Sequence, residues 1–316
     1  MSFPNQLQTW PGVGVAGDRC SLNTNNFSLL AGQGAFVAGS AGVTIGNMAW
    51  VDYGTGIVTS FGSGLIGGFI SREQQGLITQ YLGETSFQVA PGYQVTVHSA
   101  GDFWVKNTGT TVATPGQKAY ANYATGAITF AATGSPPTGA VVVGGIASST
   151  ATFTAAIAIP ATPANAPGTM TVSAVSSGTL SAGGTVTGLT SVAAGTTIVT
   201  QLTGTAGGTG TYEVSIPQTV VSSTGTATNG LLTVSGTTSG TLSVGQVMSG
   251  SGVTAGTAIT QIGTYNGTTG TVYVNYSQTV SGGTTLTVYG GVETRWTAYS
   301  FGQTGELVKI STTAQG

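Results

Sequence analysis

The sequence is poor in charge, cysteine and histidine, and each shortage excludes a class of function. Charged residues make up 4% of the 316 positions, and six Lys+Arg against eight Asp+Glu give a net charge of −2. Without a basic surplus the chain cannot neutralise many phosphates, so we expect no nucleic-acid partner. One cysteine, Cys20, and one histidine, His98, are too few for an intrachain disulfide, a cysteine-rich zinc site or a histidine-based metal site.

No motif for catalysis or cofactor binding fits its surroundings. Residues 12–17 match the Gly-x-Gly-x-x-Gly dinucleotide pattern, but Pro11 precedes them and a polar stretch follows where a helix is required. His98 is expected on the polar face of a strand, as a surface or interface residue, because no Gly-x-Ser-x-Gly nucleophile motif accompanies it. The carboxylates lie near basic residues, which favours local neutralisation over a paired-carboxylate site. We therefore expect no enzyme activity, no cofactor and no metal.

Long apolar runs are also missing. The longest aliphatic run, around residues 140–147, is far shorter than the about 20 residues of a membrane-spanning helix. The first residues carry neither a basic start nor the apolar core of a secretory signal. We expect no membrane partner.

What the sequence does contain favours β-structure. Thr, Val, Ile and Tyr are abundant, and 53 glycines punctuate the chain in clusters every few residues, as in sandwiches and barrels. Apolar and polar residues alternate over 93–99 and 292–299, which predicts half-buried strands. One short helix is expected over 71–83, where a capping box precedes apolar residues at helical spacing and Gly83 ends the pattern. The predicted fold is all-β: a small β-barrel or jelly-roll-like sandwich with one short helix, plus one or two inserted β modules.

The distribution of charge divides the chain. Of the fourteen charged residues, nine precede residue 119, four follow residue 292, and only Glu213 lies between. All four tryptophans lie on the charged side of this division. We expect residues 1–130 with 290–316 to form one domain and residues 131–167 to be a loop and linker.

An internal repeat fills the rest of the insertion. The runs Gly178–Gly183 and Gly240–Gly245 match, and so do Gly210–Val214 and Gly270–Val274, at a nearly constant offset. This predicts two tandem β modules, 168–228 and 229–289, that share one strand order. Their outer faces, rich in Thr, Ser and Gly, are expected to face solvent.

Four segments carry a resemblance to a known family. Gly68–Leu82, Ser99–Asn107, Gly116–Ala121 and Gly305–Ser311 resemble the structural cement (decoration) proteins of tailed-bacteriophage heads. The resemblance implies an all-β virion protein on the outer surface of the capsid, which stabilises the head by bridging subunits of the major capsid protein. It also implies contacts with further copies of itself, as a homodimer or homotrimer.

Aromatic and charged residues of the domain formed by 1–130 and 290–316 are the contact candidates, because such side chains anchor protein interfaces. The candidates for contacts with the capsid or with other subunits are Trp10, Arg72, Glu73, Asp102, Phe103, Trp104 and Lys106. The competing interpretation is that the aromatic residues fill the core and that Arg72 is solvated. The alternative function is a phage-surface adhesion or glycan-binding protein, associated with the tail or fibre, whose repeat modules would contact a host-surface glycan.

Overall fold

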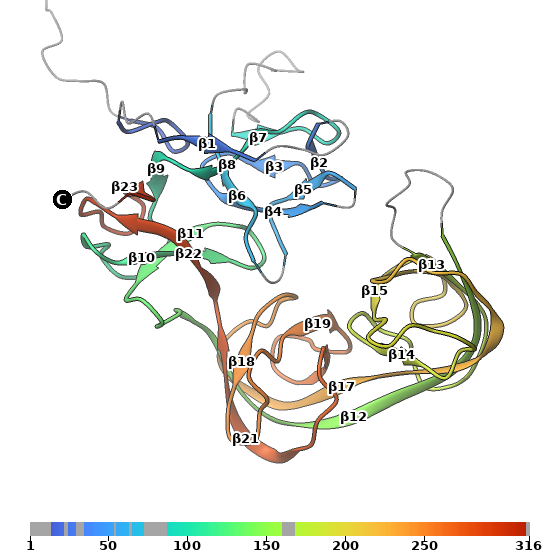
Figure 1. Ribbon diagram of the computed structural model, residues 1–316. Helices are drawn as coiled ribbons and strands as arrows, with labels where there is room; N and C mark the ends of the chain where they lie inside the picture. The colour runs from blue at the N-terminus through green and yellow to red at the C-terminus, as the bar shows by residue number, and fades with distance from the viewer. Residues whose placement is uncertain are drawn as a thin grey trace, which may run out of the picture.

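The fold is a framework of small sheets that carries two β-barrels (Figure 1). The computed structural model describes residues 14–21, 25–29, 35–53, 55–62, 65–72, 87–159 and 168–313, and every regular element within them is a strand. The all-β prediction is therefore confirmed. The helix expected over 71–83 falls mainly on residues that lie outside the described ones.

The framework, residues 14–137 and 290–313, contains two larger sheets and one strand pair. The first sheet has the order β1-β8-β6-β4-β5-β2, the second has the order β11-β10-β22-β23-β9, and β3 pairs with β7. Neighbouring strands are antiparallel except β2 and β5. The strands before the insertion are β1 (Phe27–Ser28), β2 (Val37–Ala38), β3 (Val43–Thr44), β4 (Met48–Asp52), β5 (Ile57–Thr59), β6 (Gly68–Ile70), β7 (Gln88–Val89), β8 (Val97–Ala100), β9 (Asp102–Lys106), β10 (Lys118–Asn122) and β11 (Ile128–Ala131), and those after it are β22 (Gly291–Ala298) and β23 (Leu307–Ser311).

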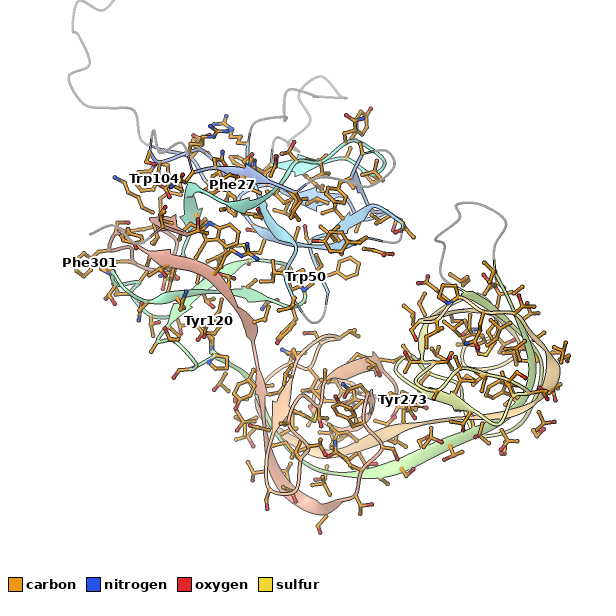
Figure 2. The ribbon with its side chains drawn as sticks, viewed as in Figure 1. Phe27, Trp50, Trp104, Tyr120, Tyr273 and Phe301 are labelled. Carbon is orange, nitrogen blue, oxygen red and sulfur yellow. The ribbon has the colours of Figure 1, made fainter. Side chains whose placement is uncertain are left out.

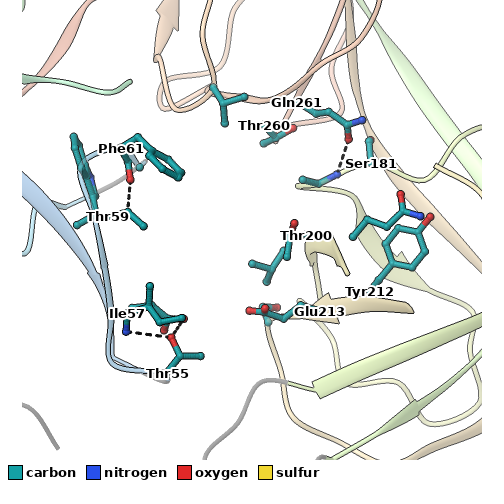
Figure 3. A pocket seen from close by; sticks show the side chains of 18 of the residues that line it. Thr55, Ile57, Thr59, Phe61, Ser181, Thr200, Tyr212, Glu213, Thr260 and Gln261 are labelled. Atoms are coloured by element: carbon teal, nitrogen blue, oxygen red, sulfur yellow. Dashed lines mark hydrogen bonds between the residues drawn. The ribbon is translucent and has the colours of Figure 1, made fainter. Parts of the chain in front are cut away.

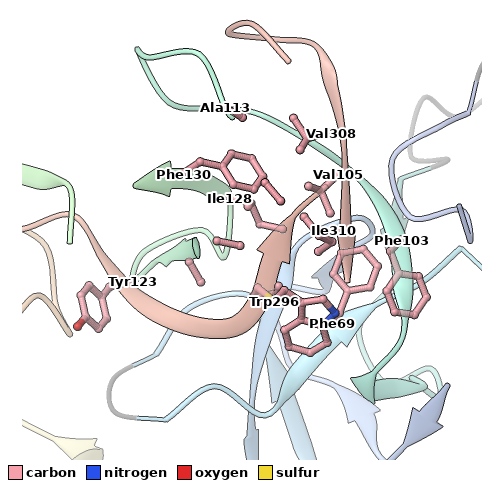
Figure 4. Packing of buried hydrophobic residues seen from close by; sticks show 14 of the residues in the cluster. Phe69, Phe103, Val105, Ala113, Tyr123, Ile128, Phe130, Trp296, Val308 and Ile310 are labelled. Atoms are coloured by element: carbon pink, nitrogen blue, oxygen red, sulfur yellow. The ribbon is translucent and has the colours of Figure 1, made fainter. Parts of the chain in front are cut away.

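The main framework core lies between these two sheets (Figure 4). Phe69 of β6 stacks on Phe103 of β9 with ring centroids 4.5 Å apart, and the Trp296 ring lies 6.4 Å from Phe69. The Trp296 indole N–H donates to the backbone oxygen of Gly101 at 3.1 Å, so the polar atom of this buried ring is satisfied. Segments that precede and follow the whole insertion thus share one core.

The predicted alternation over 292–299 is confirmed, because β22 buries Thr294, Trp296 and Ala298 and exposes Arg295. The expectation for His98 is wrong. His98 is 3% exposed, its Nε2 lies 2.8 Å from the Ser71 hydroxyl oxygen, and its ring lies 5.2 Å from Phe103. The reason is that β8 is an internal strand of the first sheet, and the second sheet covers the face that the sequence pattern marks as polar.

The insertion forms two barrels, and its strands begin earlier than the sequence indicates. Residues 131–167 are not a loop and linker throughout: Thr138–Ala158 form β12, the joint-longest strand of the described chain. The remaining strands are β13 (Gly168–Ser177), β14 (Thr185–Thr187), β15 (Ile198–Gly204), β16 (Gly210–Val214), β17 (Val220–Gly240), β18 (Met248–Ser249), β19 (Ile259–Ile262), β20 (Gly270–Val274) and β21 (Val280–Tyr289).

Both barrels have the same strand order, as the repeat predicts. Barrel 1 runs β14-β17-β12-β13-β16-β15, and barrel 2 runs β18-β21-β12-β17-β20-β19. A bridge between Thr185 and Thr197 closes barrel 1, and a bridge between Val247 and Ala258 closes barrel 2. The strands β12 and β17 belong to both barrels, so the boundary between the two modules runs across continuous strands.

The strand β12 itself contains a repeat. Its first half pairs with β17 and β21 and its second half with β13 and β17, so that Val142 and Phe153 occupy equivalent places. Burial falls on even-numbered residues from 140 to 146 and on odd-numbered residues from 151 to 157. The same change of phase occurs in β17 between Asn229 and Gly230. Because side chains alternate along a strand, the two cores use opposite faces of the β12–β17 ribbon.

The sequence Gln-Thr-Val occurs at 218–220 and again at 278–280, and matching polar contacts explain this repetition. The Gln218 side chain accepts from Ala193 N and donates to the Thr196 hydroxyl, both at 2.7 Å, in barrel 1. In barrel 2, Gln278 accepts from Thr254 N and donates to the Thr257 hydroxyl, both at 2.8 Å. Thr196 and Thr257 are completely buried, so each glutamine satisfies polar groups that water cannot reach.

The repeated glycines Gly178 and Gly240 are required by the backbone. Both have a φ of 73°, and a Cβ there would overlap the carbonyl oxygen of Thr150 or Gly139 in β12. Thr150 and Gly139 are separated along β12 by the same spacing as the equivalent residues Phe153 and Val142. The repeated glycine therefore allows the backbone of each barrel to approach its half of β12 closely.

The insertion leaves and re-enters the framework at one place. Gly290 N donates to the Pro137 oxygen at 2.7 Å, and β12 pairs with β21 directly beyond this contact. Beside it, the Tyr120 hydroxyl lies 2.7 Å from the Ala132 oxygen and 2.8 Å from a Glu293 carboxylate oxygen. Burial and the hydrogen bond to Glu293 raise the pKa of Tyr120 to about 12. This cluster ties β10 and β22 to the turn that leads into the barrels.

Candidate interaction surface

An extended N-terminal segment forms one edge of the framework. Residues 14–20 run beside β9: Gly17 N donates to the Trp104 oxygen at 2.8 Å, Trp104 N to the Asp18 oxygen at 2.9 Å, and Cys20 N to the Asp102 oxygen at 3.1 Å. Because β23 covers the other edge of β9, this segment occupies the free edge of the second sheet, with a β-bridge between Arg19 and Phe103. The glycine at position 14 lies against the Trp104 indole, where a larger residue would overlap the ring.

Charged side chains gather around Trp104. Arg72 Nη1 lies 3.3 Å from Asp18 Oδ1, and both side chains remain substantially exposed. Lys309 of β23 places its ammonium 5.1 Å from the centre of the Trp104 ring, a cation–π distance. Lys106, at the end of β9, is exposed. We call these five residues, Asp18, Arg72, Trp104, Lys106 and Lys309, the β9 face.

Two of the predicted contact residues are core residues instead. Phe103 is fully buried between Phe69 and His98, so a partner cannot reach its ring. Asp102 is 5% exposed, and it accepts a hydrogen bond of 2.5 Å from the Ser21 hydroxyl. The expectation that Phe103 and Asp102 contact a partner is therefore corrected, because the packing of the framework covers both positions.

The structure brings Arg72, Trp104 and Lys106 to one side of the framework, and these three stay candidates. Trp10 and Glu73 lie outside the described residues. Beside this face, burial and then the charge of Asp102 raise the pKa of the Cys20 thiol to about 11. Cys20 is therefore a protonated, unreactive thiol at neutral pH.

Exposed aromatic residues also lie at the end of the framework that carries the β9 face. Phe301, in the turn between β22 and β23, is 71% exposed, and Phe27 of the edge strand β1 is 60% exposed. Figure 2 shows Trp104 and Phe301 at the end of the framework that is remote from the barrels. Neither phenylalanine is among the contact residues predicted from the sequence. Their signal is a large apolar residue between polar or glycine neighbours, outside any alternating run.

The described residues hold no group of three or more His, Cys, Asp or Glu side chains that could bind a metal ion. No helix long and apolar enough to cross a membrane occurs in that part of the chain.

Comparison with known proteins identifies the family. The model of the XM1 gp53 minor capsid protein family matches residues 3–161, half of the chain. The chain belongs to the XM1 gp53 minor capsid protein family. The matched region covers the N-terminal part of the framework and the strand β12 of both barrels, but not the repeats. No curated protein and no solved structure matches the chain.

Membership of the XM1 gp53 family makes this protein a structural component of a bacteriophage virion that contacts other capsid components. A structural capsid family also points to a role in assembly instead of catalysis. The match extends through the end of β12.

Proposed function

We propose that the protein is a head cement protein, which binds the outer surface of the phage head through its framework and bridges neighbouring major capsid protein subunits. The observation that carries the proposal is the contrast between the two ends of the molecule. The framework end presents the β9 face and the exposed Phe301, whereas the barrels contain one charge, Glu213, and no tryptophan. Tryptophan and arginine are the residues that most often dominate binding energy at interfaces.

The arrangement of the insertion supports the same orientation. The barrels join the framework at Pro137 and Gly290, and Figure 2 shows Trp104 of the β9 face on the other side of the framework from the barrels. A protein attached through the β9 face would therefore hold the barrels away from its attachment point. Many weak contacts on one particle become effective together, so a modest interface for each subunit suffices.

The test uses purified heads that lack this protein, to which the recombinant chain is added. We expect Trp104→Ala and Arg72→Ala to reduce the bound amount, and the matched control Tyr276→Ala, an exposed aromatic of barrel 2, to leave it unchanged. An aromatic or arginine anchor is worth about 2 kcal/mol, so binding should weaken about thirtyfold. Equal binding by all three variants would contradict attachment through this face.

The copy number in the virion separates this function from the adhesion alternative. A cement protein is present in an amount close to that of the major capsid protein, whereas a tail or fibre component is present in a few copies. Densitometry of purified virions measures this ratio, and a ratio of a few copies for each particle would contradict the cement function.

A further inference from the structure

A cleft of about 1000 Å³ lies where the framework and the two barrels meet (Figure 3). The β4–β5 hairpin of the framework forms one wall, the strands β15 and β16 of barrel 1 form the opposite wall, and residues of barrel 2 complete it. At its base, Ala182 N of barrel 1 donates to the Gln261 side chain of barrel 2 at 3.3 Å. Three separate parts of the fold therefore shape this cleft.

Its lining combines exposed apolar side chains with negative charge. Five large apolar residues of the lining are at least 40% exposed, and Leu65 is 93% exposed; they are Ile57, Phe61, Leu65, Val199 and Val244. The lining also contains Asp52 and Glu213, and the described lining residues include no Lys, Arg or His. Exposed apolar groups that gather in a concave site mark an interaction surface.

Glu213 is the residue that distinguishes this cleft. It is the only charged residue between Lys118 and Glu293, and Figure 3 shows its carboxylate directed across the cleft toward the Thr55–Ile57 turn. Within the described residues its carboxylate makes no hydrogen bond or ion pair. Burial and then the charge of Asp52 raise the pKa of Glu213, so its ionised form is held at a cost to the free protein.

The repeat provides an internal control for Glu213. At the equivalent position of barrel 2, Tyr273 lies in β20 with the equivalent pairing partners in the sheet. The barrel fold therefore does not require a carboxylate at this position. A residue that costs stability and is not needed for folding points to binding.

We propose that this cleft receives a peptide segment of another virion protein that presents an arginine or lysine flanked by apolar side chains. The cation would lie between Glu213 and Asp52, and the flanking side chains would cover Ile57, Leu65, Val199 and Val244. Asp52 is held in position by the Thr55 hydroxyl, which donates to its carboxylate at 2.7 Å. Family membership supplies the kind of partner, a virion protein, and the proposal does not depend on the protein lying on the outside of the head.

The test is a titration of the full chain, with labelled methyl groups, followed by nuclear magnetic resonance. The probes are acetyl-Val-Arg-Leu-amide, acetyl-Val-Gln-Leu-amide and the neutral sugar maltotriose. We expect the arginine peptide to shift the methyl signals of Ile57, Leu65, Val199 and Val244, and the glutamine peptide to bind about fivefold more weakly, equivalent to about 1 kcal/mol for a solvent-screened ion pair. Glu213→Gln should remove this difference between the peptides.

The matched control is Glu306→Gln, which also removes one negative charge but lies in the β22–β23 turn, where it accepts from Gln303 N. This variant should keep the fivefold preference. Three outcomes would overturn the proposal: no methyl shifts at millimolar peptide, equal binding of both peptides to the unaltered chain, or loss of the preference in Glu306→Gln. Tighter binding of maltotriose at the same methyl groups would instead assign the cleft to a glycan and would also overturn it.

Discussion

The deletion of the barrels should leave a folded framework only if the deleted segment includes every strand of the barrels, β12 among them. Pro137 and Gly290 are hydrogen-bonded at 2.7 Å, so the chain can be rejoined there by an Asn-Gly turn, the sequence preferred in two-residue hairpins. We expect the deletion of 138–289 to yield a soluble, folded protein. A deletion of 168–289, whose boundaries follow the repeat in the sequence, retains β12 without any of its partner strands.

The structure gives the amount of apolar burial that each of the two deletions loses. In the shorter deletion, Val142, Ile146, Phe153 and Ile157 lose the neighbours that now keep each of them at most 1% exposed. Burial of such a side chain is worth about 1.5–3 kcal/mol, so about 6–12 kcal/mol of apolar burial is lost. In the longer deletion the framework core loses the partly buried Val247, which costs about 1 kcal/mol, and the core residue Tyr123 loses its contact with Gly245.

Tryptophan fluorescence is the suitable assay, because all four tryptophans lie outside 138–289 and report on the framework alone. The thermal transition of the longer deletion should lie within a few degrees of the framework transition in the full chain, and gel filtration should show no aggregate. The shorter deletion should aggregate and bind a hydrophobic dye. An aggregated longer deletion, or a soluble and dye-free shorter one, would contradict this prediction.

Three further predictions concern single side chains, and a fourth concerns salt. Tyr120→Phe should reduce the loss of stability that the intact chain shows between pH 10 and 12, because a pKa of about 12 means that the folded state retains the proton that the unfolded state releases near pH 10.0. Part of the loss should remain, because burial also raises the pKa of Tyr123 and Tyr212; denaturant melts across this range measure it. Gln218→Ala and Gln278→Ala should destabilise barrels 1 and 2 by similar amounts, about 1–2 kcal/mol, in urea melts followed by circular dichroism. Glu213→Gln should stabilise the free chain by about a few tenths of a kcal/mol at neutral pH, and this gain should disappear in acid, where the raised pKa lets the native carboxyl protonate first. Attachment to heads should weaken little with salt at a net charge of −2, and release by moderate sodium chloride would contradict this.

The elements that sequence predicts well are those in which local pattern and tertiary environment agree. Over 292–299 the alternation identifies the face that β22 buries. One face of this strand packs into the core, as the pattern indicates, and the other face is more exposed. The repeat likewise predicts a common strand order, since equal spacing of glycine and apolar residues fixes equal register.

The elements that it misses depend on partners far away in sequence. His98 is buried because two sheets meet over it, and nothing within a few residues of this position records that packing. For Phe103 the competing interpretation, that the aromatic residue fills the core, is the correct one. The strand β12 is missed for a second reason. Its side chains are mostly small, and its alternation changes phase between Ile146 and Ala151, so no single periodic run covers it.

Because both barrels share β12 and β17, the two copies of the sequence repeat do not correspond to two independent modules. Two tandem modules would each fold around residues of one copy, but here each core needs half of β12, which precedes both copies, and β17 begins in one barrel and ends in the other. Barrel 1 is joined to the framework along this two-stranded ribbon, and it also contacts barrel 2 at Gln261 and Thr260. The pairing along this ribbon and the contact between Ala182 and Gln261 therefore help to place Glu213 opposite Asp52. A change at Asn229, whose side chain donates to the Ser181 hydroxyl at the middle of the ribbon, should alter the cleft without touching any residue that lines the framework wall.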